Sequence, residues 1–366
     1  MKILFAIKKY GGIAGGAEKV LSIVSSELAK RGHEVIILNF DEKNKKPFYY
    51  LDETVELINI DICNKFLSNK YLQFFRRILA LRKKILEVKP DVVVGFMHSI
   101  YILLSLSLIG LKINLIASEH IVPQYYKNRK LEYLLINFST FFIKKFTVLS
   151  DDIKKNFSFL IRRKMIVLKN PIESKLFLKS PKLKSKYTIL SVGRLTEQKD
   201  HQTLIKAFST LIDKYKNWDL LIVGEGHLRP YLEDLIKDLN IGKNVFLPGV
   251  SSNIYKYYES ADIFVIPSRF ESFGLVVGEA MSSSLPIIGF KDCPGITKLI
   301  INNSTGFLVE CRDNRVIHLA QAIKKLMDDE KMRFRFGQLG YERIKTYSST
   351  DNIIVAWENL LFENIN

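Results

Sequence analysis

Cysteine is scarce in this chain of 366 residues. The three that occur, Cys63, Cys293 and Cys311, share no spacing typical of a metal site. So small a number disfavours a disulfide framework and a structural zinc centre, and we expect a reduced, cytoplasmic protein.

Long apolar runs are also missing. The most membrane-like segment, residues 99–120, is divided by Gly110 and Lys112 into a short helix and a buried strand, each too short to span a bilayer. The opening residues, MKILFAIKKYGG, have too short an apolar run for a signal peptide and predict a first strand instead. We therefore expect no transmembrane helix.

Acidic residues are few in the N-terminal part. The net charge is +17, and residues 1–170 hold 29 basic and 15 acidic residues, whereas residues 171–366 hold 26 and 23. Either the lysines make a solvated surface, or the N-terminal part faces an anionic partner such as phosphate, nucleic acid or an acidic membrane.

What the chain does have is a regular alternation of short apolar runs and amphipathic stretches. Runs such as ILFAI, EVIILNF and DVVVGF, and later YTILSVGR, DLLIVGEG and DIFVIPS, predict buried parallel strands separated by helices. This is the pattern of an α/β fold with two doubly wound domains. The proline- and lysine-containing stretch 169–187 is interpreted as a linker. We expect domains over residues 1–170 and 171–349, and a last helix within 350–366 as a candidate to pack back on the first.

Four glycines lie between the first predicted strand and helix, in YGGIAGG. Glycine lets the backbone approach a ligand closely, and a helix N-terminus offers free amides to an anion. The spacing fits neither the dinucleotide fingerprint nor a Walker A loop, so the segment is either a phosphate loop or a structural turn.

Charged residues follow two predicted strands of the C-terminal half, where open α/β sheets bind ligands. In VGRLTEQK, Arg194 and Lys199 combine a guanidinium fork with a point charge, which suits a diphosphate, although a solvated loop would look the same.

In SRFESFGLVVGEAM, Glu271 and Glu279 flank a predicted helix start. The two carboxylates suit either two contacts to one ligand, a hydrolase pair, or a helix-start acid with a surface glutamate. The amides that could hold a phosphate there belong to Phe273, Gly274, Leu275 and Val276.

In order and spacing, AGGAE, SEH, VGRLTEQK, VGEG and ESFGLVVGEAM resemble the motifs of the retaining glycosyltransferases of family 4. The resemblance covers nearly the whole chain and implies the GT-B fold, in which two Rossmann-like domains face each other across a cleft. It implies a nucleotide sugar held mainly by the C-terminal domain and an acceptor held mainly by the N-terminal one. Ser272 stands where the family usually has glycine.

The resemblance also implies roles for single residues. Arg194 and Lys199 match the pair that binds the donor diphosphate, while Glu271 matches the carboxylate that contacts the transferred sugar. Glu279 matches the one that hydrogen-bonds the ribose, and His120 matches a histidine near the reacting sugar. Together, Glu271, His120, Arg194 and Lys199 form the expected catalytic set. The remaining donor contacts would come from the glycine loop and the nucleoside edge, at Gly15, Gly16, Gly224, Glu225 and Gly226.

Retention of configuration follows from the family alone, because no nucleophile is evident opposite the sugar. A same-face mechanism, with the diphosphate leaving group stabilised by cations and helix amides, fits that absence. No Asp-x-Asp motif occurs to anchor a metal. We therefore expect an enzyme that needs no metal and no cofactor.

The predicted helix 65–86 is basic and rich in aromatics. Residues 65–84 carry seven basic residues and no acid. Leu67, Tyr71, Phe74, Phe75, Ile78 and Ile85 are expected on one face, and Lys70, Gln73, Arg77 and Lys84 on the other. Such a helix either packs on the sheet or contacts an acidic membrane or anionic acceptor.

The sequence thus predicts transfer of a hexose or N-acetylhexosamine from a nucleotide sugar, with UDP favoured over a guanosine nucleotide. The expected acceptor is a glycan, either a membrane lipid-linked oligosaccharide or a surface polysaccharide precursor. A polyprenyl-diphosphate-linked glycan would place the protein on the cytoplasmic face of the inner membrane, with Lys70, Arg77 and Lys84 facing the acceptor or the membrane. A GT-B sugar-nucleotide epimerase is an alternative. A nucleic-acid-binding protein is a more distant one, because no nucleic-acid module is recognisable and we expect no such partner.

Overall fold

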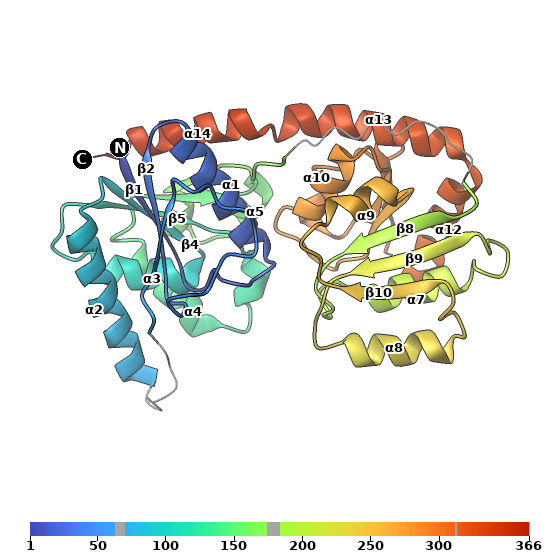
Figure 1. Ribbon diagram of the computed structural model, residues 1–366, viewed down its shortest axis with the longest axis horizontal. Coiled ribbons are helices and arrows are strands. Elements are labelled where there is room, and N and C mark those ends of the chain that lie inside the picture. The colour runs from blue at the N-terminus through green and yellow to red at the C-terminus, as the bar shows by residue number, and fades with distance from the viewer. Residues whose placement is uncertain (63–69, 174–183, 312, 366) are drawn as a thin grey trace. The chain divides into compact units, whose positions relative to one another are not determined.

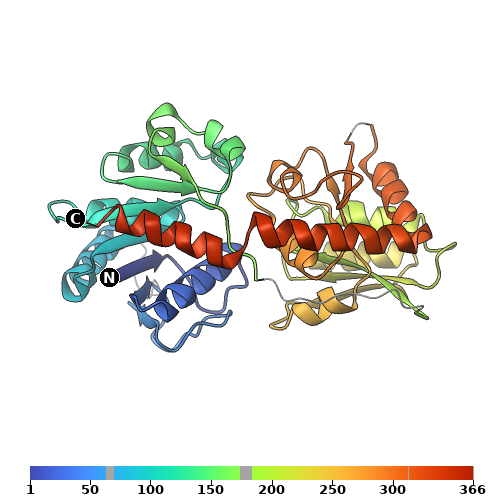
Figure 2. The ribbon, with the colours of Figure 1, turned by 90° about the horizontal axis from the view of Figure 1, so that it is seen from above.

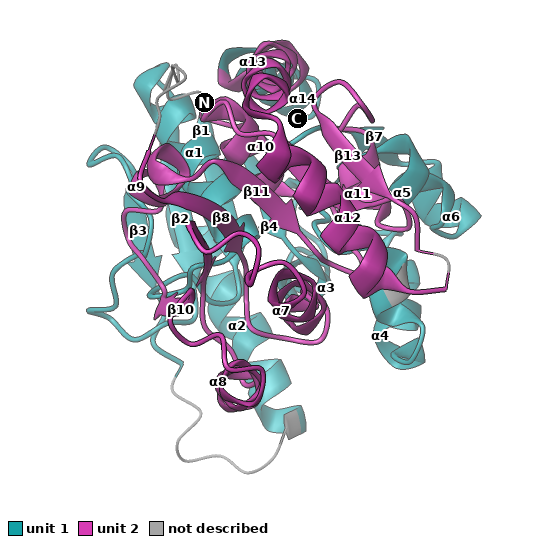
Figure 3. Cartoon of the chain, turned by 90° about the vertical axis from the view of Figure 1, so that its right-hand side faces the viewer, with its two compact units in different colours: residues 1–171, 351–366 teal, residues 172–350 magenta. Residues whose placement is uncertain are grey.

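A computed structural model describes residues 1–62, 70–173, 184–311 and 313–365. The chain forms two compact units, which Figure 3 colours separately. Unit 1 consists of Met1–Pro171 and Asp351–Asn366, and unit 2 of Ile172–Thr350. Most of the predicted linker 169–187, and the first residues of the predicted helix 65–86, lie outside the described residues.

Unit 1 is built on a parallel sheet of seven strands in the order β3-β2-β1-β4-β5-β6-β7. The strands are β1 (Lys2–Ile7), β2 (Glu34–Asn39), β3 (Glu56–Asn59), β4 (Val92–Phe96), β5 (Asn114–Ser118), β6 (Lys145–Val148) and β7 (Met165–Val167). The central strands are apolar throughout and buried, as expected when helices cover both faces of a parallel sheet.

The helices of unit 1 pack on both faces of its sheet (Figure 1). They are α1 (Gly16–Lys30), α2 (Lys70–Val88), α3 (His98–Ser107), the 3-10 turn η2 (Pro123–Tyr126), α4 (Lys130–Ser139), α5 (Asp151–Lys155) and α6 (Phe159–Arg162). Helix α3 packs on β1, β4 and β5, and both α2 and α4 pack against α3.

The last helix, α14 (Thr350–Phe362), lies along the strands of unit 1, as Figure 2 shows. Its Trp357 ring stacks on Phe96 of β4 at a centroid distance of 6.0 Å and meets Phe5 of β1 edge-on at 6.2 Å. Glu358 is bonded to Arg31 at 2.8 Å and to His33 at 3.1 Å. Apolar and charged contacts together hold this helix on the sheet.

Unit 2 is built on a second parallel sheet, with the strand order β10-β9-β8-β11-β12-β13. Its strands are β8 (Tyr187–Val192), β9 (Trp218–Val223), β10 (Val245–Gly249), β11 (Ile263–Ile266), β12 (Ile287–Phe290) and β13 (Gly306–Val309). Its helices are α7 (His201–Ser209), α8 (Arg229–Asp238), α9 (Tyr255–Ser260), α10 (Leu275–Ser282), α11 (Pro294–Thr297), α12 (Arg315–Asp328) and α13 (Glu330–Tyr347). The predicted α/β fold class, with two doubly wound parallel sheets, is confirmed.

Each sheet has one point at which the strand order reverses direction. In unit 1 this switch point lies between β1 and β4, and in unit 2 it lies between β8 and β11. The loops that leave the carboxyl ends of such neighbouring strands diverge and leave a crevice, which is where open α/β sheets bind ligands. The two switch points therefore locate the sites described below.

Candidate active site

At the switch point of unit 2, a lysine and a glutamate 72 residues apart form an ion pair. Lys199, from the loop after β8, places its Nζ 2.5 Å from Oε1 of Glu271, from the loop after β11. Both side chains are mostly buried, and the Ser268 hydroxyl donates to the same carboxylate oxygen at 2.7 Å. The carboxylate of Glu271 is thus held in one orientation by two donors.

The backbones of these two loops are also joined. The Arg269 amide donates to the carbonyl of Gln198 at 2.9 Å, and the Gln198 side chain donates to the carbonyl of Phe270 at 2.9 Å. Gly295 of α11 lies against the backbone of Glu271 so closely that a side chain there would collide with it. The ion pair is therefore carried by a rigid double loop rather than by two independent segments.

Arg194 leaves the same switch point with an exposed side chain. Its loop lies against His201, the first residue of α7, whose buried ring is close to the backbone of Gly193 and Arg194 and has Nδ1 3.5 Å from the Ser191 hydroxyl. Burial is the main cause that lowers the pKa of His201 to about 3, so the ring is neutral at physiological pH. His201 is a structural brace for the Arg194 loop.

Helix α10 begins directly beyond Glu271. Gly274 is its N-cap, with φ of +80°, a conformation that glycine adopts without strain. The amides in the first turn of a helix have no partner within that helix, so those of Leu275 and Val276 can bind an anion. One turn further on, Glu279 is buried and accepts a hydrogen bond of 2.8 Å from the hydroxyl of Tyr258.

The loop after β9 contributes the predicted nucleoside edge. Gly224 donates its amide to Gly249 at the end of β10, and Leu195 donates to the carbonyl of Glu225, both at 2.9 Å. The carboxylate of Glu225 itself is paired with Arg229, with contacts of 2.9 and 2.6 Å. Backbone hydrogen bonds therefore hold this loop beside the Arg194 loop. The Glu225 side chain already forms an ion pair with Arg229.

In unit 1, the glycine loop follows β1. Gly15 is the N-cap of α1 and Gly16 its first residue. A Cβ at position 15 would meet the carboxylate of Glu18, the flexible end of a side chain, which would have to move aside. Upstream, the amides of Tyr10 and Gly11 both donate to Asp41 Oδ2 at 2.7 Å, which fixes the start of the loop.

His120 follows β5 and is held by a chain of hydroxyls. The Thr147 hydroxyl donates to Ser118 Oγ at 2.9 Å, and Ser118 Oγ lies 2.9 Å from Nε2 of His120. Because Thr147 supplies one hydrogen, Ser118 can donate its own hydrogen to Nε2, and in that arrangement the imidazole proton lies on Nδ1. The ring stacks on Phe96 at 5.0 Å, and burial lowers its pKa to about 4. His120 is thus a neutral ring that can donate from Nδ1.

Glu119, next to His120, is a buried acid that the sequence reasoning passed over. It accepts from the hydroxyls of Tyr101 at 2.6 Å and Tyr126 at 3.0 Å, and from the Ile121 amide at 2.9 Å. Burial outweighs these bonds and raises the pKa of Glu119 to about 7. The carboxyl group ties together the loop that carries His120.

The structure corrects the predicted faces of α2. Phe74, Ile78 and Ile85 are half-buried or buried, but Tyr71, Phe75 and Leu79 are 81%, 61% and 65% exposed. Arg77, expected on the solvated face, is half-buried over the Phe40 ring, with its guanidinium carbon 5.5 Å from the centroid. Helical periodicity cannot show this, because the ring that covers Arg77 belongs to another element. Lys84 is paired with Glu87 at 2.7 Å on the helix surface.

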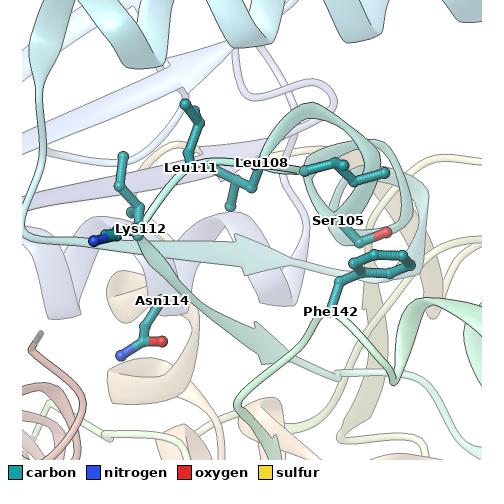
Figure 4. Close-up of a pocket in the computed structure, with 9 residues that line it drawn as sticks. Ser105, Leu108, Leu111, Lys112, Asn114 and Phe142 are labelled. Carbon is teal, nitrogen blue, oxygen red and sulfur yellow. The ribbon is translucent and has the colours of Figure 1, made fainter.

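One hollow of unit 1 lies away from all of these residues (Figure 4). It encloses about 630 Å³ between the end of α3, the turn into β5 and Phe142. It opens at the amino end of β5, whereas His120 follows the carboxyl end. The lining is mainly apolar: Ser105, Leu108, Ile109, Gly110, Leu111, Lys112, Ile113, Asn114 and Phe142.

Two general features complete the description. Within the described parts of the chain, no three His, Cys, Asp or Glu side chains are gathered as metal ligands would be. None of the helices described there combines the length and the apolar character needed to cross a membrane.

The fold and the site define a class of protein. Two doubly wound parallel sheets, with a basic–acidic pair at the switch point of the second, are the architecture of GT-B glycosyltransferases. Two solved structures share the fold. One is sucrose-phosphate synthase from Thermosynechococcus elongatus, with a TM-score of 0.84, 19% identity and 99% coverage of both chains. The other is HepE from Anabaena in complex with UDP, with a TM-score of 0.79, 17% identity, and coverage of 99% of this chain and 100% of the other.

Sequence comparison gives the family. Residues 14–175 match the model of Glycosyltransferase Family 4, and residues 173–343 that of Glycosyl transferases group 1. An uncharacterized glycosyltransferase of Haemophilus influenzae is 31% identical over 98% of this chain and 99% of its own. An α-1,4-N-acetylgalactosaminyltransferase of Campylobacter jejuni, named for a GalNAc-containing glycan on undecaprenyl diphosphate, is 30% identical over 99% of both chains. The chain belongs to the retaining glycosyltransferases of family 4.

Proposed function

We propose that this enzyme transfers a hexose or N-acetylhexosamine from a UDP-sugar to a glycan carried on a polyprenyl diphosphate. The observation that carries the proposal is the Lys199–Glu271 pair, fixed at the switch point beside the exposed Arg194. The UDP bound in HepE supports the base of the donor, and the name of the Campylobacter relative supports the class of acceptor.

In the proposed donor site, Arg194 and Lys199 bind the diphosphate. Lysine has three N–H donors, so Lys199 can keep its bond to Glu271 while it contacts a phosphate oxygen. The backbone amides of residues 273–276, at the start of α10, donate further hydrogen bonds to the diphosphate. They are already in position before the ligand binds. Glu279 accepts a hydrogen bond from a ribose hydroxyl, and the backbone at Gly224, Glu225 and Gly226 borders the base.

Catalysis then rests on stabilising the leaving group. As the bond between sugar and diphosphate breaks, negative charge gathers on the phosphate oxygens next to Arg194, Lys199 and the α10 amides. Glu271 is already bonded to Lys199 and Ser268 and is therefore better suited to position the sugar than to shuttle a proton. The released diphosphate takes the proton of the attacking acceptor hydroxyl on the same face, which retains the configuration.

Unit 1 contributes two further contacts. His120, a neutral ring whose Nε2 lies 2.9 Å from Ser118 Oγ, donates a hydrogen bond from Nδ1 to a sugar hydroxyl. The glycine loop at Gly15 and Gly16 has no side chains of its own there, so the donor phosphates can approach the backbone and the start of α1 closely. None of these steps requires a metal or cofactor, and metal independence stays a prediction.

Helix α2 is the proposed membrane-facing element. Its exposed Tyr71, Phe75 and Leu79 recur at every fourth position and so form one apolar stripe. Basic residues of the same helix, Lys70 and Lys84 among them, would add attraction to anionic lipid. We expect co-sedimentation with acidic vesicles and much weaker binding to neutral ones; equal binding to both would contradict this role.

A screen of nucleotide sugars tests the proposed reaction. The wild-type protein should release UDP from one UDP-sugar when a polyprenyl-diphosphate-linked glycan is supplied, and the product should be a longer glycan with a retained linkage. Glu271→Ala should lose at least 100-fold in rate, by analogy with the loss of a transition-state contact. Full activity in that variant would overturn the site, and recovery of an epimerised sugar without transfer would favour the epimerase alternative.

A further inference from the structure

Lys8 occupies an unusual place in unit 1. It directly follows β1, at the switch point of the first sheet, and its side chain is half-buried. Among the residues that the structure describes, no hydrogen bond or ion pair to its ammonium group is found. Withdrawing a cation from water without a partner costs free energy. The position of Lys8 therefore favours an anionic ligand from outside the protein.

A second cation lies beside it. The amide of Phe40, which follows β2, donates to the carbonyl of Lys8 at 3.3 Å, and the guanidinium of Arg77 lies 5.5 Å above the Phe40 ring. Arg77 thus extends from α2 to the carboxyl edge of the sheet where Lys8 emerges. Burial, and after it the Arg77 charge, lowers the pKa of Lys8, as expected when two like charges are brought together in a partly desolvated place.

The acidic neighbour of Lys8 is shared with other side chains. Glu132 of α4 also acts on Lys8, but its carboxylate is bonded to Arg129 at 2.9 Å and lies 3.4 Å from Nε2 of His98. His98 follows β4, the strand next to β1 at the switch point. Lys8 and Arg77 therefore face an acid, Glu132, that is already shared with Arg129, which favours an anionic ligand.

We propose that Lys8 and Arg77 bind the diphosphate of the acceptor. This inference rests on the proposed function, because it assigns the acceptor end of the same reaction. A guanidinium fork and a flexible point charge together suit the two phosphates of a diphosphate. Helix α2 carries both the apolar stripe for the membrane and, on its inner side, Arg77. A lipid-linked diphosphate lying at the bilayer surface would thus meet the cations next to the stripe.

Binding of farnesyl diphosphate, measured by calorimetry in saturating UDP, tests the proposal. UDP fills the donor site, so the probe reports on a second diphosphate site. Lys8→Met and Arg77→Met should each weaken the dissociation constant about tenfold or more, because each removes a charge-assisted bond. Lys9→Met is the matched control, since Lys9 is the exposed neighbour, and it should change binding less than twofold. Unchanged affinity in Lys8→Met would overturn the site.

Two further measurements distinguish a lipid-linked diphosphate from free pyrophosphate and from lipid headgroups. Inorganic pyrophosphate should bind more weakly than farnesyl diphosphate but show the same dependence on Lys8. Co-sedimentation with phosphatidylglycerol vesicles should be unaffected by Lys8→Met, because Lys8 is half-buried whereas the apolar stripe of α2 is exposed. Loss of vesicle binding in that variant would overturn the proposal, since Lys8 would then contact lipid headgroups rather than the acceptor.

The same samples distinguish this inference from the proposed donor chemistry. If the wild-type protein binds no UDP, the donor assignment fails whatever farnesyl diphosphate does. If it binds UDP normally and its affinity for farnesyl diphosphate does not depend on Lys8, only the acceptor site fails. Folding is checked by thermal unfolding: Lys8→Met should melt at or slightly above the wild-type temperature, because it relieves repulsion with Arg77. A large drop would instead identify Lys8 as a structural residue.

Discussion

The two sheets place a lysine at the same topological position and treat it differently. In unit 2, Lys199 follows the first strand at the switch point and is neutralised by Glu271 from the loop across it. In unit 1, Lys8 follows β1 at the corresponding point and meets another cation, Arg77. The charge in unit 2 is compensated before a ligand binds, and the charge in unit 1 is left for the ligand to compensate.

This difference indicates how a site divides its tasks. A paired lysine is held in one geometry, which suits a group that must act on charge developing in a transition state. An unpaired lysine gains more from an anion in the ground state, which suits capture of a substrate that arrives already charged. The contrast can be tested by changing each lysine in the same way.

The largest effect is expected on stability. Lys199→Met leaves the Glu271 carboxylate mostly buried without its cation, and removing one partner of such a pair costs about 3 kcal/mol. Lys8→Met leaves no buried charge unpaired and should change the free energy of unfolding by less than about 0.5 kcal/mol. Urea unfolding of the two variants, followed in each unit by hydrogen exchange, measures both. Equal destabilisation would remove the proposed difference between the two lysines.

A smaller effect is the pH dependence of stability that we expect in unit 1. Glu119 has a folded pKa of about 7, above its ordinary value, so it takes up a proton more readily when folded. The contribution of Glu119 to the free energy of unfolding is therefore greatest below the pKa of the unfolded chain, and it falls as the pH rises toward 7. Glu119→Gln cannot ionise and should gain about 1–2 kcal/mol relative to wild type between pH 5 and pH 7.5. The free energy of unfolding of unit 1 is measured against pH for both proteins. Parallel curves would contradict a raised pKa of Glu119.

The smallest effect concerns the donor site. Tyr258→Phe removes the hydrogen bond that orients Glu279 but leaves the ring that fills the core. The KM for the nucleotide sugar should rise about threefold to tenfold with little change in kcat, the size expected for one hydrogen bond. The KM for the acceptor should not move. A fall in kcat alone would mean that Glu279 acts in the transition state rather than on the ribose.

Much of this fold could be predicted from the sequence, because its strands are strongly apolar. The runs that became β1, β4, β8 and β11 were all predicted as strands, and the helices that end at Lys30 and begin at His201 and Thr350 had clear patterns. Four strands were missed: β3, β7, β12 and β13. They have only three or four residues each, and β3 is a half-exposed edge strand whose pattern is weak.

The site was harder to predict than the fold. The sequence named Arg194, Lys199, Glu271 and Glu279, but it could not show that Lys199 and Glu271 form an ion pair, because that contact depends on the order of the strands. The supports, Ser268 and His201, were missed because a hydroxyl and a buried histidine carry no signal of their own. The prediction that Arg77 lies on the solvated face is wrong, because the Phe40 ring beneath its guanidinium lies far away in the sequence.

The central claim is that each sheet binds its own diphosphate, and crossed steady-state kinetics tests it most directly. Arg194→Ala should raise the KM for the nucleotide sugar at least tenfold and leave the KM for a diphosphate-linked acceptor unchanged. Lys8→Met should do the opposite, with Lys9→Met unchanged in both. A variant of either residue that raises both constants equally, or a Lys8 variant that raises only the donor constant, would contradict the account.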